Sequence, residues 1–579
     1  MDPRSASHVL SQIAAYLELR GESRFRIRAY EQAAGALAAL ETDDLGALDR
    51  AGTLAATRGL GPATLSIVRE LVASGESRYL EQLRAETPAG LLDLLRVPGL
   101  AAAKIHLLHE SIGVDSVDAL EAAIRDGRLA KLKGFGPKTA EKLLKGIGFF
   151  RSTGARALHH HGASAARALL GMVRAHPDVV KAEVAGSVRR HGETVGDTDI
   201  VAACRADPLH VAASFSRASG VREAARADTP SPAIIYVDGT RLDLHCVPER
   251  DFAVALWRAT GSATHVADVS ARLADRGLAI VGDVVRDARD VAVDVPDETA
   301  LYALAGLALV PPEMREAHGE IERAARGLIA DLIALTDIRG ALHCHSTWSD
   351  GKATIAEMAE ASRARGWRYI GITDHSQAAF YAGGLSRDKV LMQHAEIDAL
   401  NAAARDGFRI LKGIEADILA DGTIDYDEAL HDRFDFVVGS VHSRFAMDGR
   451  AMTERVLRAL DDPHLTVLGH PTGRLLLSRD AYPIDMDAVL EKAAERGVAV
   501  EINADPKRLD LDWRLIPKAR ALGVTFEIGP DAHSTQSLDN MGFGVGIARK
   551  GGIAAGEVLN ARTADDVLAF ARARGEVAR

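Results

Sequence analysis

The sequence predicts a multidomain α/β protein with a helical N-terminal region, a mixed α/β middle and a C-terminal distorted (βα)7 barrel. From about residue 337 onward, strand-like apolar runs alternate with helical stretches, which is typical of a parallel barrel. Before residue 150, periodic Ala and Leu residues are interrupted by short glycine turns, which is typical of packed helices. The 579 residues, 47% hydrophobic and 26% charged, provide enough apolar material for several domains.

Composition excludes several classes of protein. No apolar run is long enough to span a bilayer, and the N-terminus has no apolar signal segment, so we expect a cytoplasmic protein. Three cysteines without a CxxC pair exclude a disulfide framework and a cysteine zinc finger. The net charge of −11 is unevenly distributed along the chain. Residues 1–150 hold 19 basic and 19 acidic residues, so the rest of the chain carries the whole −11. Within them, residues 131–145 carry five lysines and one glutamate, a local patch that suits phosphate contacts.

The helical region repeats one kind of turn at residues 58–62, 97–101 and 133–137, each followed by an expected helix. Glycine allows a close backbone approach, and a helix N-terminus offers free N–H groups to a phosphate oxygen. This is the helix-hairpin-helix arrangement of sequence-independent DNA binding. The predicted DNA-contact residues are Gly59, Gly61, Gly99, Gly134, Gly136 and Lys138.

The middle region predicts a site with three carboxylates. Asp197 and Asp199 are one residue apart, so on a strand both side chains leave the same face. Asp243 lies in a second alternating strand. Three converging carboxylates suit two Mg²⁺ ions that stabilise the attacking and leaving oxygens of nucleotidyl transfer. The alternative is a pair of surface aspartates in a turn; a preceding glycine turn with Ser187 and Arg190, able to hold a triphosphate, favours catalysis.

The barrel predicts a metal centre. Its expected strands span residues 341–343, 369–373, 410–414, 436–440, 466–468, 499–502 and 524–528. Nine ligand-type residues lie at or just beyond strand ends: His343, His345, Asp350, His375, Glu415, His442, His470, Asp531 and His533. Imidazole and carboxylate suit Zn²⁺, Mn²⁺ or iron, and open coordination positions would support phosphoester hydrolysis. Arg474 is a further candidate for binding a substrate phosphate.

These motifs resemble those of bacterial family X DNA polymerases that carry a polymerase-and-histidinol-phosphatase (PHP) domain. Residues 186–200 and 241–244 resemble the family's palm motifs, residues 306–322 its thumb, and residues 25–30 the start of its N-terminal domain. The resemblance implies nucleotide-binding roles for Gly186, Ser187, Arg190, Gly196, Thr260, Gly261 and Ser262. The implied domains are an N-terminal helical DNA-binding domain at 1–85, a helix-hairpin-helix fingers-like domain at 86–152, a nucleotidyltransferase palm at 153–285, a thumb at 286–330 and a PHP domain at 336–579.

The resemblance also implies ligands and partners. Mg²⁺ would bind at the palm carboxylates, and three ions, Mn²⁺ or Zn²⁺, at the nine barrel residues. The expected substrates are deoxynucleoside triphosphates and gapped or nicked DNA with 3′ ends. We expect a monomer that has no membrane partner and is associated with the nucleoid when bound to DNA.

The sequence departs from the family in three places. Arg258 and Ala259 replace an aromatic pair, and Val266 replaces the asparagine that contacts the incoming nucleotide, so weak sugar discrimination is expected. Ile67 replaces the lysine of the deoxyribose-phosphate lyases, which argues against a Schiff-base lyase.

The predicted function is a base-excision-repair polymerase that fills short gaps, with a 3′–5′ exonuclease in the PHP domain that extends to abasic-site cleavage and 3′-phosphate removal. Asp243 is the expected base for the primer hydroxyl. One alternative is a scaffold that binds DNA ends, with a degenerate polymerase site and an active barrel. Another is a small-molecule phosphatase, which leaves residues 1–330 without a use.

Overall fold

The computed structural model describes residues 3–38, 40, 44–75, 77–88, 90–95, 97, 99–153, 156–218, 220–236, 239–329 and 331–577. Pro98, in the middle glycine turn, and residue 330, at the expected end of the thumb, lie outside them. The chain divides into two compact units, residues 1–155 and 156–579. Among the described residues, no helix combines the length and the apolar character that crossing a membrane requires.

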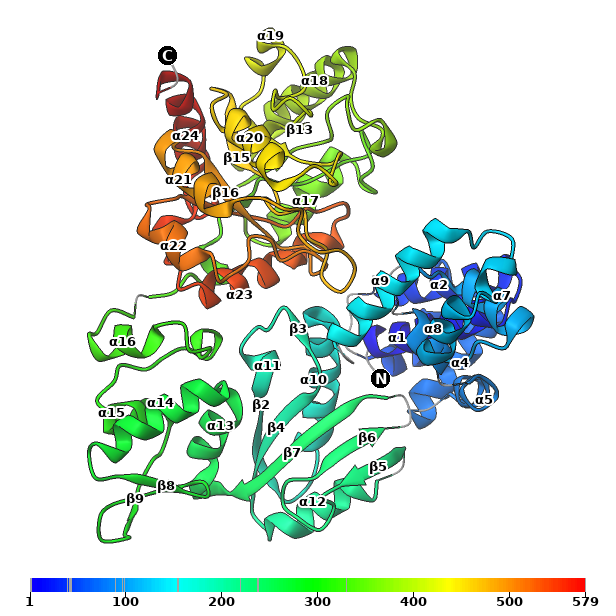
Figure 1. Ribbon diagram of the computed structural model, residues 1–579, viewed down its shortest axis with the longest axis vertical. Helices are drawn as coiled ribbons and strands as arrows, with labels where there is room; N and C mark the ends of the chain where they lie inside the picture. The colour runs from blue at the N-terminus through cyan, green and yellow to red at the C-terminus, as the bar shows by residue number, and fades with distance from the viewer. Residues whose placement is uncertain are drawn as a thin grey trace. The chain divides into compact units, whose positions relative to one another are not determined.

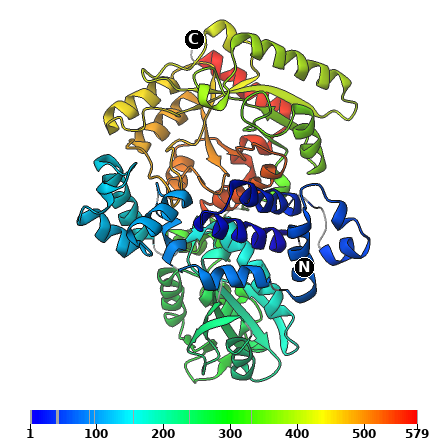
Figure 2. The same ribbon diagram turned by 90° about the vertical axis from the view of Figure 1, so that its right-hand side faces the viewer.

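The first unit is built from helices. They are α1 (Pro3–Leu19), α2 (Arg24–Ala38), α3 (Leu45–Arg50), α4 (Pro62–Ser74), α5 (Arg78–Glu86), α6 (Gly90–Leu95), α7 (Ala102–Ile112), α8 (Val117–Arg125) and α9 (Pro137–Thr153). Helices α1 and α2 pack side by side (Figure 2). Two apolar clusters form the core, one around Leu10 and Val68 and the other around Ile105 and Phe135.

Each predicted glycine turn leads into a helix, as the sequence indicates. Gly59, Gly99 and Gly134 have φ values of +102°, +88° and +94°, a backbone conformation that residues with a Cβ rarely adopt. Helices α4 and α9 each begin with proline, whose fixed φ suits the first helical position. The helical N-terminal part of the fold prediction is confirmed.

The second unit begins with a five-stranded sheet in the order β2-β4-β7-β6-β5. Its strands are β2 (Val179–Val184), β4 (Thr198–Cys204), β5 (Val221–Ala225), β6 (Ala233–Tyr236) and β7 (Arg241–Pro248). Strands β4 and β7 are parallel and the other pairs are antiparallel. Helices α10 (His159–Arg174) and α12 (Pro208–Ser216) pack on this sheet (Figure 1).

A helical segment follows the sheet. It contains α13 (Phe252–Thr260), α14 (Ala263–Ala274), α15 (Glu298–Leu304), α16 (Glu320–Ala325) and a small sheet of β8 (Ala279–Val281), β9 (Val284–Arg286) and β10 (Ala292–Val293). One apolar cluster, which includes Trp257, Tyr302 and Ile321, joins α13 to α15 and α16. The packing therefore continues across the boundary expected at residue 285.

The remainder of the chain forms a seven-stranded parallel sheet in the order β11 to β17. The strands are β11 (Gly340–Ala341), β12 (Tyr369–Ile372), β13 (Arg409–Asp417), β14 (Phe436–Ser440), β15 (Leu465–Leu468), β16 (Ala499–Asn503) and β17 (Phe526–Gly529). A parallel bridge between Cys344 and Ala532 brings the two edges together. The predicted distorted (βα)7 barrel is confirmed.

Helices cover the outside of this barrel (Figure 1). They include α17 (Ile355–Ala364), α18 (Arg387–Ala403), α20 (Gly449–Leu460), α21 (Met486–Arg496) and α23 (Met541–Lys550). Two strand predictions are corrected. Strand β11 ends at Ala341, two residues before His343, and β13 continues to Asp417, so Glu415 lies inside a strand rather than after it.

Candidate active sites

The nine predicted ligands of the barrel converge on one centre. Within three overlapping groups, the ligand atoms lie no more than 4.8 Å apart: His345, Asp350, His375 and His533; His343, His345 and Glu415; and His375, Glu415 and His442. His470 joins them through Nε2, 3.0 Å from Glu415 Oε1, and Asp531 through Oδ1, 3.4 Å from His345 Nε2. Parallel strands bring the residues together because their carboxyl ends meet at one rim of the barrel.

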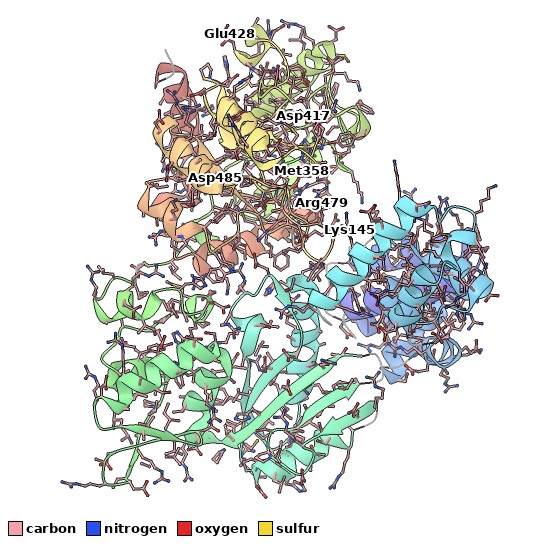
Figure 3. The ribbon with its side chains drawn as sticks, in the orientation of Figure 1. Lys145, Met358, Asp417, Glu428, Arg479 and Asp485 are labelled. Carbon is pink, nitrogen blue, oxygen red and sulfur yellow. The ribbon has the colours of Figure 1, made fainter. Side chains whose placement is uncertain are left out.

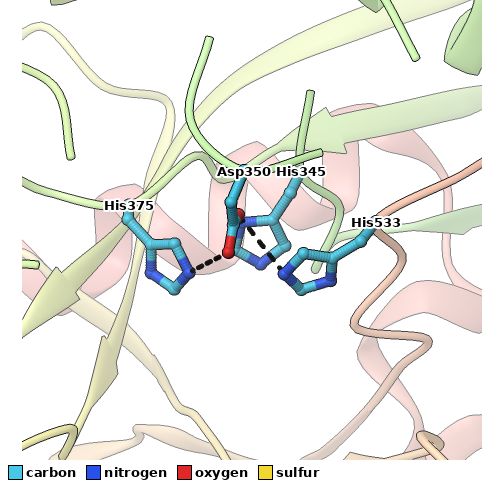
Figure 4. A group of neighbouring side chains, drawn as sticks. All are labelled: His345, Asp350, His375 and His533. Carbon is cyan, nitrogen blue, oxygen red and sulfur yellow. Dashed lines mark ion pairs between the residues drawn. The ribbon is translucent and has the colours of Figure 1, made fainter. Parts of the chain in front are cut away.

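Two carboxylates lie among the imidazoles. Asp350 lies between His375 and His533, with oxygen-to-nitrogen distances of 3.6 and 3.4 Å (Figure 4). Glu415 is buried, and its Oε1 lies 3.1 Å from His442 Nε2 while its Oε2 lies 2.8 Å from His375 Nδ1. A carboxylate with imidazoles around both oxygens would help to hold metal ions at this position.

The protonation states fit a metal centre. Burial, with help from His533 and His375, lowers the pKa of His345 to about 3, so this ring is neutral and available as a ligand. Burial opposes the charged form of His375 and His442, yet neighbouring carboxylates raise their pKa values to about 10 and 9. The carboxylates thus attract positive charge that a cation can supply in place of protons.

Unpaired ring nitrogens support the same conclusion. Among the described residues, the buried atoms without a hydrogen-bond partner include His343 Nε2, His470 Nδ1 and both ring nitrogens of His345. A buried polar atom without a partner is costly unless something else satisfies it. A cation held by these nitrogens would satisfy them.

A second site lies on the five-stranded sheet. Asp199 and Asp243 are direct partners in the parallel β4–β7 ladder, and Asp197 lies in the turn immediately before β4. Burial, followed by the charges of Asp197 and Asp243, raises the pKa of Asp199 to about 7. Burial and Asp197 raise the pKa of Asp243 as well. The three carboxylates are therefore close enough to repel one another, which a divalent cation would offset.

Gly186 begins the short helix α11 (Gly186–Arg189) beside these carboxylates. Its φ is +57°, and a Cβ at this position would collide with the Asp199 carboxylate. Glycine is required here both by its backbone conformation and by the close approach.

The other predicted nucleotide-binding residues differ from one another in burial and in hydrogen bonding. Ser187 is half-buried in α11, and Gly196 has no atom within 4 Å of the space that a side chain would take. The Thr260 hydroxyl is buried and accepts from Arg189 Nη1 at 2.8 Å. Arg190 donates to Glu316 Oε1 at 3.0 Å and to the Thr260 carbonyl at 2.7 Å, so a phosphate would compete with these bonds.

Gly261 and Ser262 form the turn between α13 and α14. Ser262 Oγ accepts from the His265 backbone N–H at 3.2 Å and begins α14 as its N-cap. Its backbone N–H donates to the Arg315 carbonyl at 3.0 Å. The hydroxyl and the backbone N–H of Ser262 therefore both stabilise the turn.

A cavity of about 340 Å³ opens beside the carboxylates, and its lining includes Asp199, Asp243, Arg258 and Ala259. Arg258 is held there by Asp283, with Nη2 2.7 Å from Oδ1. A polar wall thus replaces the aromatic wall that the family resemblance predicts.

The predicted DNA contacts of the first unit lie at its surface. All six residues named for that role are exposed, and so are the five lysines between residues 131 and 145. Lys145 lies on α9 (Figure 3) and forms an exposed ion pair with Glu141 at 2.9 Å. Exposed backbone and lysine groups are the kind that contact phosphates without reading sequence.

Comparison with known proteins identifies the family. The PHP domain model matches residues 341–505, a SAM-like helix-hairpin-helix tandem matches residues 91–148, and a helix-hairpin-helix domain matches residues 3–77. A protein of Bacillus subtilis (strain 168) named DNA polymerase/3'-5' exonuclease PolX is 38% identical over 573 residues, covering 98% of this chain and 99% of that protein. The chain belongs to the PolX family. The resemblance predicted from the sequence is confirmed.

Two other relatives match only part of this PolX family member. A protein of Thermoanaerobacter sp. (strain X514), named a probable phosphatase, is 30% identical over 236 residues, covering 38% of this chain and 88% of that protein. A probable phosphatase of Syntrophotalea carbinolica (strain DSM 2380) is 29% identical over 239 residues, covering 40% of this chain and 94% of that protein.

Two buried carboxylates that the sequence does not mark as site residues hold the predicted metal ligands of this PolX family member in place. Glu501 Oε1 lies 2.5 Å from His343 Nδ1, and Asp417 Oδ1 lies 2.8 Å from His442 Nδ1. Such partners fix the ring so that the other nitrogen faces the metal. A buried charge within the apolar strand β16 was the available signal for Glu501.

Asp374 holds the loop that carries Asp350. Its buried carboxylate accepts from the Ser346 backbone N–H at 2.8 Å, from Ser346 Oγ at 2.6 Å and from Gln393 Nε2 at 2.6 Å. It is therefore a support for the site, although it precedes the ligand His375 directly.

Two arginines lie near the barrel rim, and the sequence singles out only one of them, Arg474. Arg474 does not face the metal centre with a free guanidinium; it donates to Glu193 Oε1 at 2.5 Å and to Asp512 Oδ2 at 3.0 Å. These contacts occupy the guanidinium, so they argue against the predicted contact of Arg474 with a substrate phosphate. Arg508 lies nearer the centre, with Nε 3.5 Å from Asp531 Oδ2, and is the better placed cation.

Proposed function

We propose that this chain is a DNA polymerase that fills short gaps and also hydrolyses phosphoesters at DNA 3′ ends, as a 3′–5′ exonuclease. The observation that carries the hydrolytic half is the convergence of nine imidazole and carboxylate side chains at one rim of the barrel. The name of the Bacillus subtilis relative, of which this chain covers 99%, supports both halves.

For the polymerase, Asp197, Asp199 and Asp243 would hold Mg²⁺, which supplies charge stabilisation for the attacking and leaving oxygens. Asp243 is the proposed base for the primer hydroxyl. Its Oδ1 accepts from Arg226 Nη2 at 3.1 Å, an exposed contact that an incoming substrate can displace. The roles of Gly186, Ser187 and Arg190 toward the triphosphate remain part of this proposal.

For the hydrolase, the nine barrel residues would hold three ions, Mn²⁺ or Zn²⁺, which activate water for attack on phosphorus. Arg508 would add positive charge for the substrate phosphate beside Asp531. Abasic-site cleavage, 3′-phosphate removal, a place in base excision repair, a monomeric state and a cytoplasmic location associated with the nucleoid belong to the proposal. So do the five domain boundaries predicted from the sequence.

A second candidate function is a protein that binds DNA ends with a degenerate polymerase site and an active barrel. The observation in its favour is the cavity beside the carboxylates, where Arg258 is tied to Asp283 and the Thr260 hydroxyl is buried. The raised pKa values of Asp199 and Asp243 favour a working cation site instead.

Primer extension on gapped DNA, beside release of a labelled 3′ nucleotide, tests the polymerase. Asp243→Ala is expected to abolish nucleotide addition and leave 3′ hydrolysis nearly intact, because its carboxylate belongs to one site only. Asp228→Ala, which removes an exposed carboxylate from the turn between β5 and β6, is the control. Equal loss of both activities in a folded Asp243→Ala protein would refute two independent sites, and a wild-type protein without extension would favour the second candidate.

Metal analysis together with 3′ hydrolysis tests the barrel. The double substitution His343→Ala with His345→Ala is expected to release metal and eliminate hydrolysis, while DNA affinity changes little. His210→Ala, which removes an exposed imidazole from α12, is the control. Wild-type metal content and hydrolysis in the double variant would show that the assignment is wrong.

A further inference from the structure

Two adjacent aromatic side chains lie exposed on the barrel at the 3₁₀ turn Phe380–Ala382. Phe380 is 84% exposed and Tyr381 is 61% exposed, with ring centroids 6.0 Å apart and planes inclined by 78°. Neighbouring Ala379 and Ala382 are buried, so the turn has an inner face and still presents both rings outward. Rings left in water gain little of the hydrophobic stabilisation that burial provides, so folding alone does not explain them.

The turn that carries the rings is fixed at both ends. The backbone N–H of Ser376 donates to the Glu415 carbonyl at 2.9 Å, and that of Leu385 donates to the His375 carbonyl at 2.9 Å. Between them, the Ala378 N–H donates to Asp425 Oδ2 at 2.7 Å. The backbone that carries the rings is therefore held in place before any ligand arrives, which reduces the entropy lost on binding.

The turn lies at the rim of the metal centre. It follows the ligand His375 by five residues and is hydrogen-bonded to the strand that carries Glu415. Partial burial, followed by the negative charges of Asp417, Glu415 and Asp350, raises the pKa of the Tyr381 hydroxyl. Tyr381 therefore lies in the electrostatic field of the cluster while most of its surface remains open.

A cavity of about 470 Å³ lies beside the turn, and its lining includes Phe380, Arg387 and Tyr426. Its size is within the range of small-ligand sites. Arg387 is half exposed, with its Nη1 2.7 Å from Asp427 Oδ2. The surface thus offers an aromatic ring, an arginine and open space around one cavity.

We propose that Phe380 and Tyr381 are a stacking platform for unpaired bases of the DNA strand whose 3′ end enters the metal centre. The proposal rests on the function proposed above and deepens it, because it names two residues that would position the DNA strand at the hydrolytic site. Aromatic side chains bind every base through its π face, so the platform is independent of sequence. It favours frayed or single-stranded 3′ ends over paired ends, whose bases are already stacked in the duplex.

Two substrates separate the platform from the metal centre. One is a single-stranded oligonucleotide with a labelled 3′ end, and the other is bis(p-nitrophenyl) phosphate, which has no base. Phe380→Ala and Tyr381→Ala are each expected to lower kcat/KM for the oligonucleotide by at least about fivefold, the factor for one weakly stacked base. Hydrolysis of bis(p-nitrophenyl) phosphate is expected to stay within twofold of wild type.

Control variants test the specificity of the effect. Tyr381→Phe keeps the ring and is expected to retain most of the oligonucleotide activity. Leu522→Ala removes an apolar side chain, 37% exposed, that precedes β17 and so lies at the opposite end of the barrel; it is expected to change neither reaction.

A binding readout keeps the platform testable apart from hydrolysis. An oligonucleotide with 2-aminopurine next to its 3′ end is expected to lose fluorescence on binding the wild-type protein and to regain part of it with Phe380→Ala or Tyr381→Ala. Unchanged oligonucleotide kinetics and fluorescence in both variants would overturn the platform. So would an equal loss on both substrates. If wild type cleaves bis(p-nitrophenyl) phosphate but no DNA, the proposed exonuclease fails, and the fluorescence result still decides whether the rings stack on bases.

Discussion

Arg474 joins the barrel to the loop that precedes the predicted polymerase carboxylates. Only 11% of its side chain is exposed, and the same holds for Glu193, its partner across 281 residues of sequence. The guanidinium also donates to Asp512 Oδ2 at 3.0 Å and to the Arg508 carbonyl at 3.1 Å. We therefore predict that Arg474→Ala destabilises the protein and leaves substrate binding at the metal centre largely unchanged.

The magnitude follows from what the substitution leaves behind. Removing one partner of a buried ion pair costs about 3–5 kcal/mol, because the remaining charge stays buried without compensation. Arg474→Ala leaves the buried Glu193 carboxylate with the half-exposed Arg514 as its remaining ion-pair partner, and it also removes a donor from Asp512, so the lower end of this range applies. A loss of about 3 kcal/mol or more in the free energy of unfolding is expected.

Urea unfolding of the full chain measures the loss, and steady-state hydrolysis of a labelled 3′ end measures KM. The matched control is Arg514→Ala, since Arg514 contacts the same Glu193 at 3.3 Å but is 51% exposed. An exposed pair of this kind contributes about 0–1 kcal/mol. Unchanged stability together with a raised KM in Arg474→Ala would refute the structural role and restore Arg474 as a phosphate ligand.

Three further predictions concern the middle of the chain. Gly186→Ala is expected to abolish nucleotide addition but not 3′ hydrolysis, because a φ of +57° is strained for alanine and the new Cβ would displace Asp199. The control is Gly171→Ala, since a Cβ at position 171 has open space around it. With Val266 in place of an amide donor, steady-state incorporation is expected to show only a weak preference for a matched dNTP over the rNTP, because one lost hydrogen bond lowers discrimination by about 1–3 kcal/mol, or about 5- to 160-fold. A strong dNTP preference would show that another residue selects the sugar. Burial, with His191 beside it, lowers the pKa of His159 to about 3 in the folded protein, whereas the same imidazole has a pKa of 6.5 in the unfolded chain. Between these two values the unfolded chain binds the additional proton, so the free energy of unfolding falls as pH drops from 6.5 toward 3. At pH 5 this group alone is expected to cost about 2 kcal/mol, and urea unfolding at pH 7.5 and pH 5 should show a smaller difference for His159→Gln if the assignment is right.

The sequence by itself determined the barrel and predicted most of the side chains that converge at its rim as candidate metal ligands. Alternating apolar strands and helices predict parallel strands, and parallel strands deliver their carboxyl ends to one rim. For that reason residues as distant as His343 and His533 could be assigned to one centre from their positions after strands. The glycine turns were equally readable, because Gly59 and Gly134 take backbone conformations that depend on local sterics alone.

Only the tertiary structure decided which polar groups pair with one another. Glu501 contacts His343 across 158 residues, and Arg474 is bound to Glu193 instead of facing a phosphate. Likewise, Thr260 belongs to a motif that predicts nucleotide contact, yet its hydroxyl is buried against Arg189. Periodicity states which face of an element is apolar, but a hydrogen bond between distant elements depends on how those elements pack. The energies of buried charges depend on the same packing, since burial and neighbouring charges together set each pKa.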